Sequence, residues 1–320
     1  MSAVICGTGS YVPAYKMDND EIAKLVETSD AWIRERTGIR ERHVAKTETT
    51  TYMAAQAAKR ALEDAEVSPK EIELIIVATL SSDIITPCTA CEVQKEIGAM
   101  GTACFDINAA CSGFTIAYNM VDAFFEAGQY RTALIVAAES LSCLTDWTDR
   151  NTCILFGDGA GAAVVKKGAG RHYFSVTHSD GEKSFALTCK NRLTTRVEPF
   201  PREYYIDMNG QEIFKFAVRK VPELIRELLQ KNNVRQEEIT WFVVHQANSR
   251  ILESVARHLG EPSFKFPMNL QYYGNTSSAS IPILLDEMNR QGKLKKGDKV
   301  LIAGFGAGLT WSGNILDWGI

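Results

Sequence analysis

The chain contains two copies of one unit, separated by a constant offset of 167 residues. The segment Glu71–Val77 resembles Glu238–Val244, and the strand-like segment Leu134–Val136 resembles Leu301–Ala303 at the same offset. In each copy a helical pattern precedes the first of these segments. Two separate segments that repeat at one offset indicate a duplicated unit in which strands alternate with helices.

The apolar strands of both copies are continuous rather than alternating, which is typical of sheets covered by helices on both faces. They are Leu74–Ala78, Ala133–Ala137, Trp241–Val244 and Val300–Ala303. No linker rich in Pro or Ser separates the copies. We therefore predict an α/β protein of two halves, residues 1–168 and 169–320, that pack directly together.

Composition excludes several classes of protein. The net charge is −4 and no basic run stands out, which argues against a nucleic-acid-binding protein. No run of about 18 apolar residues is present, so we expect no membrane span. The eight cysteines are spread through apolar segments and are expected to be reduced core thiols in a cytoplasmic protein.

Cys111 is the first candidate for chemistry, because it directly precedes a helical pattern from Phe114 to Glu126 that Gly128 ends. A thiol at a helix start faces unpaired N–H groups and the positive end of the helix dipole. The dipole contributes about 0.3–1 kcal/mol, whereas one pKa unit requires about 1.36 kcal/mol. Neighbouring hydrogen bonds, or proton transfer to a histidine, must therefore supply the rest of the activation.

The offset relates the Cys111 turn to a second turn. It pairs Asn108 with Asn275 and Cys111 with Ser278, so the two helix starts are predicted to converge on one site. His245 follows the second copy's strand, and the ends of such strands are where α/β sheets bind ligands. A structural histidine remains an equal alternative at this point.

Three further motifs have two interpretations each. Cys88 and Cys91 have redox or zinc spacing but no second pair, so the first turn of a helix is the preferred interpretation. Gly157–Gly161 lacks the G-x-G-x-x-G spacing of a dinucleotide loop. Gly304–Gly308 is either a tight turn or a source of backbone N–H groups for an oxyanion.

Four segments resemble the active-site segments of β-ketoacyl-acyl-carrier-protein synthase III, a condensing enzyme with the thiolase fold. They are Asp106–Gly113, Val243–Asn248, Gly274–Ser278 and Phe305–Trp311, and further matches are Thr28–Ile33, Arg36–Arg42 and Asp149-Arg150 ahead of Phe156–Gly161. The resemblance covers essentially the whole chain in order. It implies a thiolase-like five-layer αβαβα sandwich of two pseudo-twofold-related halves, with Cys111, His245 and Asn275 as catalytic triad.

The resemblance also implies a mechanism. Cys111 would attack the thioester of a primer acyl-CoA to form an acyl-enzyme. His245 and Asn275 would hold the enolate oxygen left by decarboxylation of a malonyl thioester, and the backbone N–H groups of Cys111 and Ala307 would form the oxyanion hole. The family usually has Gly where Ala307 stands, and Ala would be strained there if the position required positive φ.

Binding residues follow from the same resemblance. The expected CoA and pantetheine residues are Thr28, Trp32, Arg36, Arg150, Gly210, Phe214, Ala247 and Asn248, with Trp32 stacked on the adenine. The expected acyl-pocket residues are Thr86, Pro87 and Phe305, and those for carrier-protein docking are Lys215, Arg250 and Arg257. Thr86 is smaller than the Phe frequent in the family, which would admit branched or longer primers. A dimer partner is expected to complete that pocket.

Related chemistries require other residues. Thiolases use a second cysteine that Gly304–Gly308 lacks, and elongating synthases have a second histidine where Asn275 stands. Glu139 is a candidate for the glutamate base of hydroxymethylglutaryl-CoA synthases, but we expect it to be structural.

We expect a homodimeric acyltransferase that starts fatty-acid synthesis from acyl-CoA and malonyl-acyl-carrier-protein, without a metal or a resident cofactor. Two alternatives remain: a condensing enzyme of secondary metabolism with the same triad, and a redox protein that uses Cys88 and Cys91.

Overall fold

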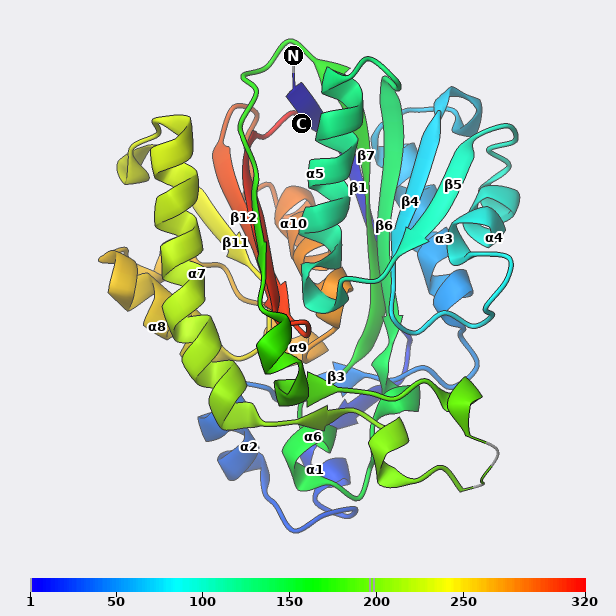
Figure 1. Cartoon of the computed structure of the whole chain (residues 1–320), viewed down its shortest axis with the longest axis vertical. Coiled ribbons are helices and arrows are strands. Elements are labelled where there is room, and N and C mark those ends of the chain that lie inside the picture. The colour runs from blue at the N-terminus through cyan, green and yellow to red at the C-terminus, as the bar shows by residue number, and fades with distance from the viewer. Residues whose placement is uncertain (1, 196, 198) are drawn as a thin grey trace.

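The computed structural model describes residues 2–195, 197 and 199–320, so Met1 of the predicted first half lies outside it. Two β-sheets form its framework (Figure 1). The first has the order β1-β7-β6-β4-β5, with bounds Ser2–Tyr11, Asp158–Gly168, Thr132–Ser140, Leu74–Ala78 and Ala103–Ile107. The second has the order β11-β12-β13-β8, with bounds Trp241–Val244, Lys299–Gly306, Thr310–Asp317 and Val176–Ser179. Two small hairpins pair β2 (Lys16–Asp18) with β3 (Glu41–His43) and β9 (Leu187–Thr188) with β10 (Asp207–Met208).

Both sheets are mixed. Strand β4 runs parallel to β5 and β6, and β11 runs parallel to β12, which accounts for the continuous apolar segments of these strands. Strands β1 and β6 both pair antiparallel with β7, and β13 pairs antiparallel with β12 and β8. Antiparallel strands in each sheet were not foreseen from the sequence.

Helices cover both faces of both sheets, which confirms the predicted five layers (Figure 1). Helices α5 and α10 lie between the sheets, α3 and α4 cover the outer face of the first sheet, and α7 and α8 cover that of the second. Their bounds are Gly113–Glu126, Ser280–Arg290, Thr50–Asp64, Thr89–Ile97, Gly210–Asn232 and Ser249–Leu259. Four short helices, α1 (Asn19–Ile22), α2 (Asp30–Thr37), α6 (Arg150–Cys153) and α9 (Leu270–Tyr273), lie at the lower end of the molecule in Figure 1.

The element boundaries follow the offset found in the sequence. Strands β4 and β11, strands β6 and β12, and helices α5 and α10 each begin 167 residues apart. The 3₁₀ turns Ala110–Ser112 and Ser277–Ala279, directly ahead of α5 and α10, obey the same offset. Even the backbone repeats, because Ala110 (φ 44°) and Ser277 (φ 49°) are both in the left-handed region. Strand β5 has no counterpart strand, since α9 occupies the equivalent residues.

Helix α5 is enclosed on all sides by the core. Its predicted polar stripe does not face solvent: Asp122 is buried and its Oδ1 accepts a hydrogen bond from Ala3 N (3.0 Å). Asn119 Nδ2 donates to Ser312 Oγ of β13 (3.0 Å). The stripe therefore connects the middle layer to both sheets.

The glycine-rich segment after Phe156 belongs to strand β7 rather than to a nucleotide loop. A Cβ at Gly161 would lie 2.7 Å from Ile283 N and 2.8 Å from Pro282 C of helix α10. The missing side chain thus lets α10 pack directly against the sheet.

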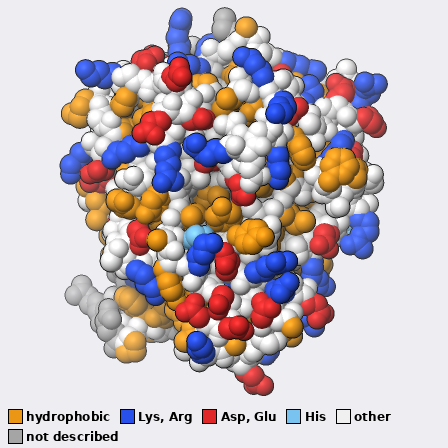
Figure 2. Space-filling view, turned by 180° about the vertical axis from the view of Figure 1, so that it is seen from behind, with side chains coloured by type: hydrophobic (Ala, Val, Ile, Leu, Met, Phe, Trp, Pro, Cys, Tyr) orange, Lys and Arg blue, Asp and Glu red, His pale blue; other side chains and the backbone are white. Residues whose placement is uncertain are grey.

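The outer surface carries charges of both signs. Figure 2 shows Lys, Arg, Asp and Glu side chains interspersed over the rear face, with hydrophobic side chains between them. Among the described residues, no helix combines the length and the hydropathy needed to cross a membrane.

Candidate active site

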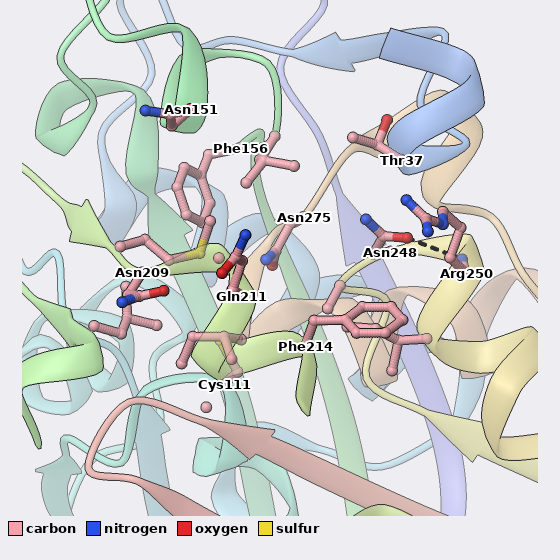
Figure 3. A pocket seen from close by; sticks show the side chains of 18 of the residues that line it. Thr37, Cys111, Asn151, Phe156, Asn209, Gln211, Phe214, Asn248, Arg250 and Asn275 are labelled. Carbon is pink, nitrogen blue, oxygen red and sulfur yellow. Dashed lines mark hydrogen bonds between the residues drawn. The ribbon is translucent and has the colours of Figure 1, made fainter. Parts of the chain in front are cut away.

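A cavity of about 920 Å³ is lined by residues of both halves (Figure 3). Of the residues expected from the sequence it brings together Trp32, Arg36, Cys111, Gly210, Phe214, Lys215, His245, Ala247, Asn248, Arg250, Asn275 and Phe305. The three members of the expected triad therefore share one cavity.

Cys111 lies in the 3₁₀ turn that leads into α5, and its side chain is buried, with 7% exposed. Strand β12 passes directly beside it. A Cβ at Gly306 would lie 2.9 Å from Cys111 Cβ and 3.1 Å from Cys111 Sγ, and one at Gly304 would lie 3.0 Å from Cys111 O. These glycines of Gly304–Gly308 are thus required because the two backbones approach closely, rather than by a positive φ.

Asn275 is held by backbone contacts with the first half of the chain. Its N–H donates to Leu155 O (2.8 Å), and its carbonyl accepts from Gly157 N (3.1 Å). The side-chain Oδ1 accepts from Ser277 N (2.9 Å). With Oδ1 engaged, the Nδ2 amide group is the donor that Asn275 offers to the cavity.

His245 follows the last residue of β11 and is 1% exposed. Its Nδ1 lies 2.7 Å from Ser280 Oγ, and the ring of Phe305 packs edge-on at 5.2 Å. The nitrogen available to the cavity is therefore Nε2. Burial lowers the pKa of His245 to about 3, so the imidazole is neutral at physiological pH.

The thiol is also shifted toward its neutral form. Burial raises the pKa of Cys111 to about 12, the charge of Glu139 adds to this shift, and the Ser277 hydroxyl opposes it. Because His245 resists protonation, proton transfer from the thiol to this ring, one of the two expected routes of activation, is disfavoured. Hydrogen bonding by a neighbouring group, the other route, has a candidate in Ser277.

Aromatic and basic side chains gather around Trp32 of α2. The Cζ atoms of Arg36 and Arg150 lie 5.8 Å and 5.0 Å from the centre of its ring. Arg150 also donates to Glu27 O (3.1 Å) and, like Thr28, does not itself line the cavity. An indole ring with two guanidinium groups suits a ligand that carries both an aromatic ring and phosphates.

Asn248 joins the two halves at the other side of the cavity. Its Oδ1 accepts from Arg250 N (2.9 Å; Figure 3) at the start of α8, and its Nδ2 donates to Arg36 O (3.0 Å). Arg250 Cζ lies 5.6 Å from the ring centre of Phe214. Arg257, on the same helix, is exposed and lies outside the cavity.

Three other expected residues do not line the cavity. Thr86 and Pro87 are exposed on the surface of the single chain, and Ala307 is next to the lining residue Gly306. Ala307 is not among the described non-glycine residues with positive φ, so the expected strain does not arise.

Several lining residues were missed by the sequence analysis. They include Asn151, Leu187, Met208, Asn209 and Gln211, and they come from α6, the β9–β10 hairpin and the start of α7. Strands of two residues carry no hydrophobic periodicity, so no sequence signal pointed to the hairpin. Phe156 had a signal, because it opens a segment that resembles the family.

The Cys88 and Cys91 motif lies away from this cavity. Cys88 is the N-cap of α4 and Cys91 lies in its first turn, as predicted. Their sulfur atoms are 3.4 Å apart and both residues are free cysteines. No cluster of His, Cys, Asp or Glu within the described part of the chain has an arrangement that could hold a metal ion.

Comparison with known proteins points in one direction. The family model described as 3-oxoacyl-[acyl-carrier-protein (ACP)] synthase III matches residues 105–181, and the corresponding C-terminal model matches residues 229–318. The β-ketoacyl-[acyl-carrier-protein] synthase III of Clostridium acetobutylicum is 47% identical over 323 residues, with 99% of both chains covered.

Solved structures agree. The 3-oxoacyl-[acyl-carrier-protein] synthase III of Aquifex aeolicus VF5 has a TM-score of 0.93 at 45% identity, with 99% of this chain and 100% of that chain covered. The priming β-ketosynthase from the R1128 polyketide biosynthetic pathway has a TM-score of 0.95 at 35% identity, with 99% and 96% covered.

Replacing Gly306 by Ala should impair Cys111 without unfolding the protein. The added Cβ would press against the thiol, and overpacking of this size costs about 1–3 kcal/mol. We expect modification of Cys111 by iodoacetamide, measured by peptide mass spectrometry, to slow at least about tenfold. Gly181→Ala is the matched control, because nothing lies within 4 Å of its Cβ. Equal rates in both variants would contradict the close approach of β12.

His245 should not titrate near neutral pH. Its lowered pKa keeps the ring neutral until the pH falls toward about 3, whereas an unperturbed histidine gains its proton near 6.5. We expect the imidazole NMR signals of His245 to stay constant between pH 5 and 8 and to titrate normally in the urea-unfolded chain. A midpoint near 6.5 in the folded protein would refute this.

Proposed function

This chain belongs to the 3-oxoacyl-[acyl-carrier-protein] synthase III family, and we propose that it condenses a primer acyl-CoA with malonyl-acyl-carrier-protein to start fatty-acid synthesis. The observation that carries the proposal is the meeting of Cys111, His245 and Asn275 in one cavity. The product is a 3-oxoacyl-acyl-carrier-protein, so the enzyme is an acyltransferase.

The first half-reaction uses Cys111. Its thiolate attacks the carbonyl carbon of the acyl-CoA thioester, and CoA leaves from the tetrahedral intermediate. The backbone N–H groups of Cys111 and Ala307 are assigned to the oxyanion. Their support is that β12 passes within contact distance of the Cys111 turn.

The second half-reaction needs two neutral donors. When the malonyl group loses CO₂, negative charge develops on the thioester oxygen of the resulting enolate. His245 Nε2–H and the Asn275 amide hold that oxygen, and one such donor is worth roughly 2.7–4 kcal/mol. The burial that keeps His245 neutral also leaves its proton on the ring for this purpose. The carbanion then attacks the acyl-enzyme and releases the product.

Substrate binding is assigned to the side chains at the entrance. Trp32 would stack on the adenine of CoA with Arg36 and Arg150 near its phosphates, a role that the short distances among these three side chains support. Phe214 and Asn248 would line the path of the pantetheine arm.

The exposed cations Lys215, Arg250 and Arg257 would meet the acidic carrier protein. Lys215 and Arg250 lie at the cavity, and Arg257 is two turns along α8 from Arg250, so they form one continuous approach.

A homodimer is part of the proposal. Strand β5 is an edge of the first sheet and all five of its residues are partly exposed. Exposed apolar side chains lie nearby in the chain, with Ile85 70% and Met100 80% exposed. An unpaired edge flanked by apolar surface suits pairing with a second copy. Such a copy would cover Thr86 and Pro87 and complete the acyl pocket beside Phe305.

A cytoplasmic location is also proposed, because Cys111 must remain a reduced thiol to react.

A second candidate function is priming in secondary metabolism. The similarity to the R1128 priming β-ketosynthase supports it, although the relative from Clostridium acetobutylicum is more similar in sequence. Steady-state rates with malonyl-acyl-carrier-protein and with malonyl-CoA distinguish the two. A strong preference for malonyl-CoA would favour the second candidate.

Incubation with acyl-CoA should acylate Cys111. We expect intact-protein mass spectrometry to show one acyl group per chain with acetyl-CoA or a branched primer, and peptide mapping to assign it to Cys111. A primer-length panel would then define the acyl pocket. Absence of an adduct with every primer would overturn the proposed function.

Variants should separate the two half-reactions. Cys111→Ala should abolish acyl transfer and retain decarboxylation of the malonyl thioester. His245→Ala should retain acylation and lose decarboxylation by about 100-fold or more, since it removes a donor to the enolate oxygen. Equal losses in both steps for both variants would contradict this division of roles.

Light scattering should give a mass of twice the 35.4 kDa of the chain. Ile85→Lys should weaken the dimer, because it places a charge on the proposed interface, and Leu25→Lys is the control at an exposed apolar position on α1's following turn. A monomeric wild-type protein at micromolar concentration would rule the dimer out.

A further inference from the structure

Glu139 is a fully buried carboxyl close to the Cys111 turn. It lies near the end of β6, and three donors surround it: Ser81 Oγ (2.7 Å), Ser278 Oγ (2.7 Å) and Leu80 N (3.2 Å). The charge of Glu139 acts directly on Cys111. The expectation from the sequence that Glu139 is merely structural does not account for an ionisable group so close to the nucleophile.

The duplication explains why Glu139 is there. By the offset of 167, Ser278 is the counterpart of Cys111 and Gly306 is the counterpart of Glu139. Gly306 approaches Cys111, and in the same way Glu139 contacts Ser278. One copy thus has an empty position beside the nucleophile, and the other has a carboxyl beside a hydroxyl.

Ser277 connects the carboxyl to the thiol. Its hydroxyl favours the ionised forms of both Cys111 and Glu139, so it lies close to both. The residue is 2% exposed, yet its Oγ makes no hydrogen bond with any described residue. A buried hydroxyl without a partner costs free energy unless it has a use.

The activation of Cys111 requires a proton acceptor, and His245 is a poor one. Burial lowers the pKa of His245 to about 3, whereas burial raises the pKa of Glu139 to about 7. The carboxylate therefore binds a proton more tightly than the imidazole by roughly four orders of magnitude. No charged side chain is among the groups that act on Glu139; its neighbours are hydroxyls, the Leu80 N–H and the Cys111 thiol.

We propose that Glu139 accepts the proton of the Cys111 thiol through the hydroxyl of Ser277. The Cys111 S–H proton passes to Ser277 Oγ as the Ser277 proton passes to the Glu139 carboxylate. The result is a thiolate beside a neutral carboxylic acid, with no net change of charge in the buried site. This inference rests on the proposed function, since it concerns the thiol that attacks acyl-CoA.

The proton balance closes over one cycle. The thiolate forms a bond to the acyl carbon, the bond to the CoA sulfur breaks, and the proton on Glu139 returns through Ser277 to the departing CoA thiolate. Condensation later releases Cys111 as a thiolate, which takes one proton from solvent. No oxidant, reductant or further reactant is required.

The test separates the half-reactions in Glu139→Gln and Ser277→Gly. Glycine tolerates the positive φ of Ser277, so that variant removes the hydroxyl without strain. We expect acylation by acetyl-CoA, followed by quenched-flow mass spectrometry, to slow about 100-fold at pH 7 in both. The deficit should shrink toward pH 9, where hydroxide replaces the acceptor. Decarboxylation of the malonyl thioester, measured with each change in a Cys111→Ala background, should stay within about threefold.

The control is Asp286→Asn, which replaces another buried carboxyl, bonded to Thr8 and Ser10 outside the cavity, and should leave both steps unchanged. Normal acylation of Glu139→Gln at every pH, or equal loss of both half-reactions, would overturn the inference and leave the proposed function intact. If Glu139→Gln does not fold, the same outcomes for Ser277→Gly decide. A wild-type enzyme that is not acylated would instead defeat the proposed function.

Discussion

The contact between the two 3₁₀ turns ahead of α5 and α10 is the interaction on which the site depends. Ala110 and Ser277 adopt the same left-handed conformation, and the two turns meet in the middle layer. Each turn is anchored to a different sheet by its own helix, and Asn275 is additionally held by backbone hydrogen bonds to Leu155 and Gly157. The geometry of the triad is therefore a property of the interface between the halves, and any shift of one half would separate the nucleophile from its partners.

Burial gives the two reactive side chains opposite roles. Removal from water favours the neutral form of every ionisable group, so it suppresses both the thiolate of Cys111 and the imidazolium of His245. A neutral imidazole suits an enolate, because it donates a hydrogen bond without adding charge. A neutral thiol suits nothing in this chemistry. The cavity thus favours the second half-reaction as built, and the first half-reaction needs help from outside the triad.

The sequence predicted the architecture because duplication is visible at a fixed offset, and the boundaries of β4, β11 and α5 agree with it to within one residue. It did not predict the antiparallel strands or the inward polar face of α5, since strand direction and contacts across layers leave no mark on local periodicity. At the site, motifs identified Cys111 and its partners. They could not reveal Asn209 or Gln211, which reach the cavity from a short hairpin, or the environment of Glu139, which depends on three segments distant in the chain.

The pairing of Gly306 with Glu139 across the pseudo-twofold axis has an evolutionary consequence. A symmetric ancestor assembled from identical units would have directed two equal nucleophiles into a single chamber, where only one acyl group fits. Once both units belonged to one gene, each could diverge alone: one kept the sulfur and cleared the space beside it, while the other surrendered its nucleophile. Fusion in this view did more than join two folds, since it allowed half of a symmetric machine to become the workshop of the other half.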